Sequence, residues 1–159
     1  MLAACSNERS PSPVPVLGDR FPELVLPDLD GHMTPFPGAP GAALLVNFWA
    51  TWCEPCRREM SGLQQLSARY RPEDLRVVGV TIDDDLNLAK EFRLNHSLTF
   101  PQLSDRDQKL SREALHISAI PVTYLLSRDR RIMRVIAGER DWTDAAVLEE
   151  IEEVFGLRR

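Results

Sequence analysis

The chain has 159 residues, the length of one globular domain, and 43% of them are apolar, which is enough to build a core. Its 19 basic and 24 acidic residues give a net charge of −5, which argues against nucleic acid or an anionic membrane surface as the main partner. Three cysteines are too few for a disulfide-stapled scaffold or a four-ligand zinc site. No window approaches the roughly 18 apolar residues of a membrane span.

The N-terminal segment differs in composition from the rest of the chain. Residues 6–17 are polar and proline-rich without periodicity, as expected of an extended tether. The preceding Leu-Ala-Ala-Cys resembles the lipobox of bacterial lipoproteins, and this resemblance implies lipidation of Cys5. A chance match is the alternative. We therefore expect a lipobox remnant and tether over residues 1–17 and one domain over residues 18–159, held at a membrane outside the cytoplasm.

Strand and helix patterns alternate along this domain. Residues 21–26, before a turn at 30–31, indicate a short strand or hairpin, and the apolar run 42–49 indicates a central buried strand. Further strands are predicted over 76–82, 100–103, 122–126 and 132–137, the last two as an antiparallel hairpin. Helices are predicted from Cys56 to Tyr70, over 86–94 and 108–115, and from Thr143 onward. The pattern indicates one layered α/β domain.

The sequence Trp52-Cys53-Glu54-Pro55-Cys56 lies where a buried strand meets the start of a helix. The free N–H groups and positive dipole end of that helix favour a thiolate at Cys53. Pro55 suits a first helical turn, where its missing N–H has no consequence. Cys56 begins the apolar stripe of the helix, so we expect it to be the more buried, resolving thiol.

Other interpretations of the cysteine pair are weaker. A structural disulfide closing so short a loop gains little chain entropy. Half of a metal site would need further ligands, but His32, His96 and His116 are far apart in sequence. Peroxidase chemistry would be expected with Pro-x-x-x-Thr-x-x-Cys, and here those positions hold Val46 and Ala50. Thiol–disulfide exchange is the favoured interpretation.

The segment VNFWATWCEPCRRE resembles the active site of the thioredoxin superfamily, specifically its TlpA/ResA/CcmG(DsbE)-like extracytoplasmic branch. The sequence Ile120-Pro121-Val122-Thr123 is similar to the cis-proline segment of that superfamily. The resemblance implies an α/β thioredoxin fold with an N-terminal β extension and a βα insertion before the cis-proline, with Pro121 opposite the cysteines. A trans proline that starts a strand is the alternative. A cis-proline would leave the backbone of Ile120 free to pair with an extended substrate, and Trp52 would add a flat apolar surface beside Cys53.

Glu59 lies one helical turn after Cys56. A partly buried carboxylate there would raise the pKa of both thiols and carry a proton during exchange, whereas a solvated glutamate beside Arg57 and Arg58 would do neither. The resemblance implies the first role. Cytoplasmic thioredoxins carry a buried aspartate where this chain has Asn47, which strengthens the case for Glu59 as proton acceptor.

The sequence therefore predicts an extracytoplasmic thiol–disulfide oxidoreductase that reduces client disulfides through Cys53 and Cys56. The resemblance implies clients of the cytochrome c maturation or copper-site assembly type and a membrane-bound thiol electron donor. No cofactor, metal or nucleic acid is expected, and nothing calls for more than a monomer. An oxidant that introduces disulfides and a Cu(I) carrier using the cysteine pair remain alternatives.

Overall fold

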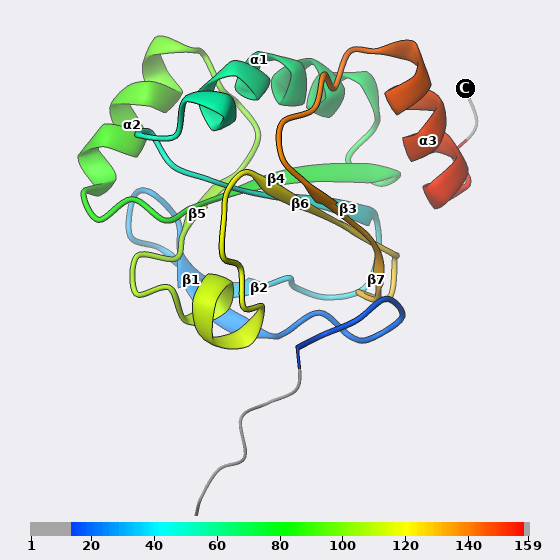
Figure 1. Ribbon diagram of the computed structural model, residues 1–159, viewed down its shortest axis with the longest axis horizontal. Coiled ribbons are helices and arrows are strands. Elements are labelled where there is room, and N and C mark those ends of the chain that lie inside the picture. Colours follow the sequence, from blue (N-terminus) through cyan, green and yellow to red (C-terminus); the bar gives the residue numbers. More distant parts are fainter. Residues whose placement is uncertain (1–13, 158–159) are drawn as a thin grey trace, which may run out of the picture.

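The computed structural model describes residues 14–157 (Figure 1). In chain order its elements are β1 (Leu24–Pro27), β2 (Met33–Phe36), β3 (Ala43–Trp49), α1 (Glu54–Arg69), β4 (Leu75–Thr81), α2 (Leu86–Asn95), β5 (Gln102–Ser104), η1 (Lys109–Ala114), β6 (Val122–Leu126), β7 (Ile132–Ala137) and α3 (Ala145–Phe155). Within these residues no helix is both long and apolar enough to cross a membrane.

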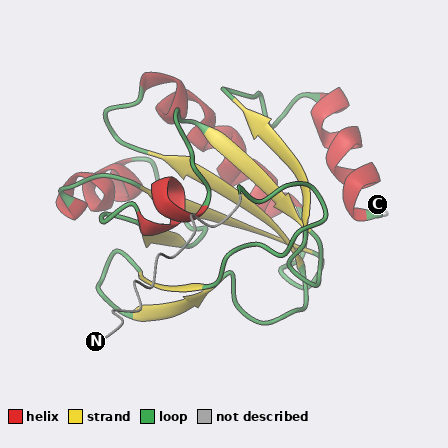
Figure 2. Cartoon of the chain, turned by 60° about the horizontal axis from the view of Figure 1, so that its bottom comes forward, coloured by secondary structure: helices red, strands yellow, loops and turns green. Residues whose placement is uncertain are grey.

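Five of the strands form one mixed sheet in the order β5-β4-β3-β6-β7. The strands β3, β4 and β5 run parallel, whereas β6 is antiparallel to β3 and β7 is antiparallel to β6. The strands β1 and β2 form a separate antiparallel hairpin, which Figure 2 shows beside the larger sheet. This is the predicted α/β thioredoxin fold with its N-terminal β extension, and both predicted hairpins are confirmed.

The central strand β3 is buried along its whole length because both faces of the sheet are covered. The helices α1, α2 and α3 cover one face, and β1, β2 and η1 lie against the other (Figure 1). Successive side chains of a strand point to opposite faces. Leu45 and Trp49 accordingly pack on the helical side, whereas Leu44, Val46 and Phe48 pack in the second core.

The helices differ from the sequence prediction at their ends and, in one case, in their type. The helix α1 ends at Arg69, and Tyr70 is its extended C-cap. The last helix begins at Ala145 rather than Thr143, because Asp144 accepts hydrogen bonds from two N–H groups of its first turn. The predicted helix over 108–115 is the six-residue π-helical segment η1. Its first N–H groups donate to the buried carboxylate of Asp105, which fixes where η1 begins.

Candidate active site

A tight turn after β3 carries the cysteine pair into the first turn of α1. Cys53 is the N-cap of α1, and its Sγ accepts a hydrogen bond from the backbone N–H of Cys56 at 3.3 Å. The two cysteines form a disulfide with their Cα atoms 5.3 Å apart. Cys56 is fully buried and Cys53 is 6% exposed, so the predicted order of burial is confirmed. The pair is therefore approached from the Cys53 side.

The loop before β6 forms the opposite wall of the site. The peptide bond between Ile120 and Pro121 is cis, as predicted. The carbonyl oxygen of Ile120 lies 3.8 Å from Cys53 Sγ. Trp52 is 67% exposed, and together with Ile82 and Ile120 it borders a pocket of about 270 Å³ that extends to η1. The more accessible of the two disulfide sulfurs thus lies beside the Ile120 carbonyl and near a largely apolar pocket.

Glu59 is buried beneath this surface, at 3% exposure, so its description as a solvated helix residue is wrong. Its Oε1 accepts a hydrogen bond from Asn47 Nδ2 at 2.6 Å. Its Oε2 accepts from the backbone N–H of Arg140 at 3.0 Å and from Trp142 Nε1 at 3.3 Å. Three donors from β3 and from the loop before α3 therefore hold one carboxyl group in the core.

Opposing effects act on the protonation of Glu59. Burial raises its pKa, and the hydrogen bonds from Arg140, Asn47 and Trp142 lower it, with burial the larger effect. The negative charge of Glu139 raises it further, although Glu139 is itself paired with Arg58 through hydrogen bonds of 2.9 and 2.7 Å. The net result is a carboxyl group that takes up a proton more readily than a solvated glutamate.

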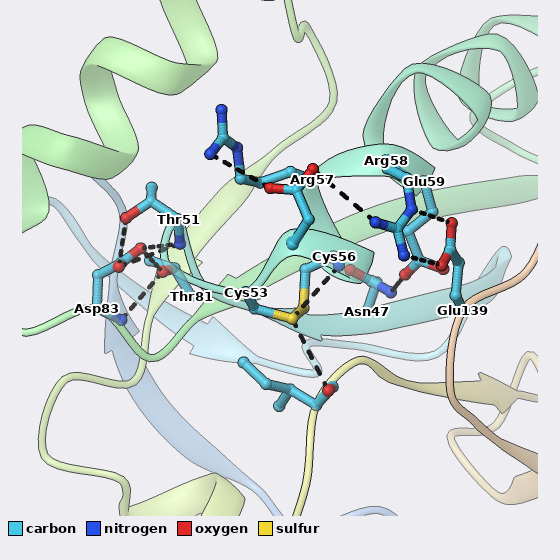
Figure 3. The surroundings of a disulfide bond; sticks show 12 residues. Asn47, Thr51, Cys53, Cys56, Arg57, Arg58, Glu59, Thr81, Asp83 and Glu139 are labelled. Carbon is cyan, nitrogen blue, oxygen red and sulfur yellow. Dashed lines mark hydrogen bonds and ion pairs between the residues drawn. A yellow bond between two sulfur atoms is a disulfide. The ribbon is translucent and has the colours of Figure 1, made fainter.

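A second buried acid, Asp83, fixes the turn that precedes Cys53, and it was not among the residues predicted from the sequence. Its carboxylate accepts hydrogen bonds from the backbone N–H of Thr51, from Thr51 Oγ1 at 2.7 Å and from Thr81 Oγ1 at 2.6 Å. Figure 3 shows this cluster on one side of the disulfide, with Asn47 and Glu59 on the other. Asp83 lies two residues after the end of β4, and the carboxyl ends of the parallel strands β3 and β4 meet at one edge of the sheet. Its position in the sequence could therefore have indicated that it lies near the cysteine pair.

The contacts of Trp142 and Arg140 with Glu59 were also missed. Trp142 is buried in the loop before α3, and its indole N–H donates to Glu59, which lies 83 positions earlier in the sequence. Neither the indole nor a backbone N–H has a sequence pattern that predicts its partner. Only the folded arrangement brings the loop before α3 onto α1.

Two further predictions concern metals and lipids. Among residues 14–157, no three His, Cys, Asp or Glu side chains gather as they would around a metal ion. Cys5, the predicted lipidation site, lies outside the described residues.

A disulfide in the first turn of a helix, facing a cis-proline in this fold, defines the class of thioredoxin-fold thiol–disulfide oxidoreductases. The sequence matches the AhpC/TSA family over residues 17–135, and the chain belongs to that family. Within it, the chain is similar to proteins of the ResA and DsbE type, as the sequence resemblance implies.

The relatives include proteins named thiol-disulfide oxidoreductase ResA. That of Geobacillus kaustophilus is 32% identical over 123 residues, which is 77% of this chain and 70% of the relative. That of Bacillus anthracis is 27% identical over 124 residues, 78% of this chain and 71% of the relative. A crystal structure from Chlorobium tepidum, assigned as the thiol:disulfide interchange protein DsbE, superposes with a TM-score of 0.80 at 25% identity, covering 89% of this chain and 99% of that one. The chain is thus a thiol–disulfide oxidoreductase of this type.

Proposed function

We propose that this oxidoreductase works as a reductant of client protein disulfides. Cys53 as thiolate attacks a client disulfide, forms a mixed disulfide and releases one client thiolate. The Cys56 thiol then gives its proton to Glu59, and its sulfur attacks Cys53 Sγ. The second client thiolate leaves, and the Cys53–Cys56 disulfide forms. Two electrons pass from the enzyme to the client in each cycle.

The observation that carries the proposal is the buried carboxyl group of Glu59, one helical turn from a fully buried resolving cysteine. A thiolate at Cys56 would be buried near a carboxylate, and both conditions disfavour its negative charge. The Cys56 thiol therefore needs a nearby group that accepts its proton when its sulfur attacks. Burial and a neighbouring acid both disfavour a highly stabilised thiolate pair. A strong oxidant needs that stabilisation, which is why the reducing direction is favoured.

Trapping the mixed disulfide tests the assignment of the two cysteines. With a disulfide-containing peptide as client, Cys56→Ser is expected to accumulate a covalent enzyme–client adduct that dithiothreitol releases. Cys53→Ser is the matched control and should form none, because Cys56 is fully buried. Mass spectrometry of the non-reduced mixture reads out both. Equal adduct formation by the two variants would contradict the division of roles.

Client recognition is proposed to use the exposed edge beside the disulfide. The Ile120 carbonyl near Cys53 and the exposed face of Trp52 support an extended client segment running along this edge. The resemblance to the ResA and DsbE type favours clients with paired cysteines, such as an apocytochrome c or a copper-site assembly factor, and a membrane-bound thiol donor that reduces the enzyme again. Trp52→Ala is expected to slow reduction of a peptide client more than reduction of a small-molecule disulfide.

The Cu(I)-carrier alternative has its own test, because two thiolates are soft copper ligands. Titration of the reduced protein with Cu(I) is read beside an insulin-reduction assay. Catalytic turnover of insulin without tight copper binding supports the reductase. Tight copper binding without turnover would replace it with the carrier.

We also propose that the domain over residues 18–159 carries the chemistry, and that residues 1–17 tether it outside the cytoplasm through a lipid on Cys5. At the proposed boundary, the Gly18 N–H donates to the Ile132 carbonyl at 2.8 Å. Removal of residues 1–13 is therefore expected to leave the rate of client reduction unchanged in solution. The anchor is tested by expressing the chain behind a secretion signal in cells supplied with labelled fatty acid. The label should be incorporated into this protein and not into the Cys5→Ser control.

A further inference from the structure

The side chain of Asn47 lies in the centre of the molecule between a carboxyl group and a hydroxyl group. Asn47 is fully buried, and its Nδ2 donates one hydrogen to Glu59 Oε1 at 2.6 Å and the other to Thr123 Oγ1 at 3.0 Å. Its Oδ1 is buried and has no hydrogen-bond partner among the described protein groups. Both hydrogens of the amide NH2 group are therefore donated, whereas the amide oxygen accepts no hydrogen bond from these groups.

The sheet fixes this arrangement. Asn47 of β3 and Thr123 of β6 are directly paired in the antiparallel register. Asn47 shares the parity of Leu45 and Trp49, so its side chain points to the face that α1 covers. Cross-strand partners on one face lie within side-chain contact of each other. Asn47 and Thr123 are therefore held together under the α1 residue Glu59.

A carboxylate can only accept hydrogen bonds, whereas a protonated carboxyl group needs an acceptor for its O–H. Rotation of the Asn47 amide by half a turn about its Cβ–Cγ bond exchanges Nδ2 for Oδ1. These two atoms are nearly equal in size, so the packing of the side chain is unchanged. The Thr123 hydroxyl accepts in one orientation and donates in the other.

We propose that Asn47 is a positioning residue that matches both protonation states of Glu59, presenting Nδ2 to the carboxylate and Oδ1 to the protonated acid. This inference rests on the proposed role of Glu59 as proton acceptor. Each time Cys56 passes its proton to Glu59, the amide turns over and Thr123 reverses its hydrogen bond. Glu59 therefore keeps a hydrogen-bond partner through the cycle, which a fixed donor would not provide.

The charged groups around Glu59 do not provide a hydrogen-bond acceptor for its protonated form. Glu139 is the charged residue that acts on it through space, and its carboxylate is engaged by Arg58. Arg140 contributes only its backbone N–H, while its guanidinium pairs with Glu150 at 3.4 Å. The side-chain partners of Asn47 are the neutral hydroxyl of Thr123 on β6 and Glu59 itself on α1.

Nuclear magnetic resonance of the oxidised protein tests the proposal, because the disulfide-bonded cysteines do not titrate. The Glu59 carboxyl carbon and the two Asn47 amide protons are followed across pH, with the exposed Asn87 amide as internal reference. When Glu59 is protonated, both Asn47 protons should shift together toward unbonded values. In Glu59→Gln, a neutral mimic of the acid, both should hold those values at every pH.

A fixed amide gives a different result: only the proton facing Glu59 shifts, and the proton facing Thr123 stays. That outcome would overturn the inference while leaving Glu59 as proton acceptor. If the rate of client reduction does not change over the pH range in which the Glu59 carboxyl carbon titrates, both the Asn47 inference and the proton-acceptor role of Glu59 are overturned.

Kinetics provide the second readout. Asn47→Leu is expected to slow resolution of the mixed disulfide roughly tenfold, a part of the 10²–10⁴-fold that positioned proton transfer contributes. In the Glu59→Gln background the same substitution should have no further effect, because Asn47 acts through Glu59. A merely structural role of Asn47 would give additive losses in the double variant and would contradict the proposal.

Discussion

Glu59 is the buried acid of the site, and in the proposed mechanism it accepts the Cys56 proton without touching the client. Its carboxyl group accepts hydrogen bonds from three donors, and burial nevertheless keeps its pKa above the ordinary value. A group poised in this way accepts a proton near neutral pH better than a solvated glutamate does. We expect Glu59→Gln to slow client reduction about 10- to 100-fold at neutral pH, measured in single-turnover assays with the exposed Glu149→Gln on α3 as control.

The same residue should make stability depend on pH. Its pKa is higher in the folded than in the unfolded chain, so the folded protein binds more protons between the two values and loses stability as pH rises through that window. Glu59→Gln removes this loss. Urea unfolding of the oxidised proteins across pH should show the free-energy difference shifting in favour of the glutamine variant as pH rises from the unfolded pKa through the folded pKa, and constant above it. A difference that stays constant with pH would contradict the raised pKa.

At the scale of single residues, the sequence predicts which residues carry the chemistry better than it predicts which residues contact them. Cys53, Cys56 and Pro121 lie where their local pattern places them, because a strand end, a helix start and a proline each restrict the backbone directly. The position of Glu59 one turn after Cys56 was predicted, but its hydrogen-bond partners were not. They come from donors more than ten residues away in sequence, which only strand register and loop docking bring together.

Among the elements, the central strands share one row of paired positions beneath the helices, which holds three polar residues and a glycine. Thr123, Asn47, Gly79 and Gln102 are register partners across β6, β3, β4 and β5. Gln102 lies over Gly79 and accepts a hydrogen bond from Trp49 Nε1 at 2.9 Å. The glycine leaves the room that this side chain occupies.

Gly79→Ala is therefore expected to be destabilising. A Cβ at this position would lie 2.1 Å from Gln102 Oε1, so Gln102 has to move and the buried Trp49 N–H loses its acceptor. We predict a loss of about 2–4 kcal/mol in the free energy of unfolding. Gly41→Ala is the control, because nothing lies within 4 Å of its Cβ position, and should change stability by less than about 0.5 kcal/mol. Equal effects in urea unfolding would contradict this account of the row.

The element order was predictable because buried strands and amphipathic helices have different hydrophobic periods. Boundaries were less predictable where a side chain outside the periodic pattern decides them. Asp144 sets the start of α3 and Asp105 the start of η1, in each case through hydrogen bonds to free N–H groups. The π-helical geometry of η1 leaves no periodic signal over six residues.

In the whole molecule, topology brings the two halves of the site together. The strand β3 ends at the turn before Cys53, and β6 runs antiparallel to β3, so β6 begins at the same edge of the sheet. Pro121 immediately precedes β6 and therefore faces the disulfide. The exposed Trp52 and the cis-proline loop then border one accessible surface, while Cys56 and Glu59 stay buried beneath it. This division fits a reductant that admits a client at one sulfur only.

The reduction potential of the Cys53–Cys56 pair tests this account most directly, by equilibration in defined dithiol–disulfide buffers with the two states separated by thiol alkylation. Reference values are about −270 mV for thioredoxin and about −120 mV for a strong oxidant. Because burial and Glu59 disfavour thiolates, we predict a value near or below that of thioredoxin. A value near the oxidant would reverse the direction of electron flow and contradict the reductant function.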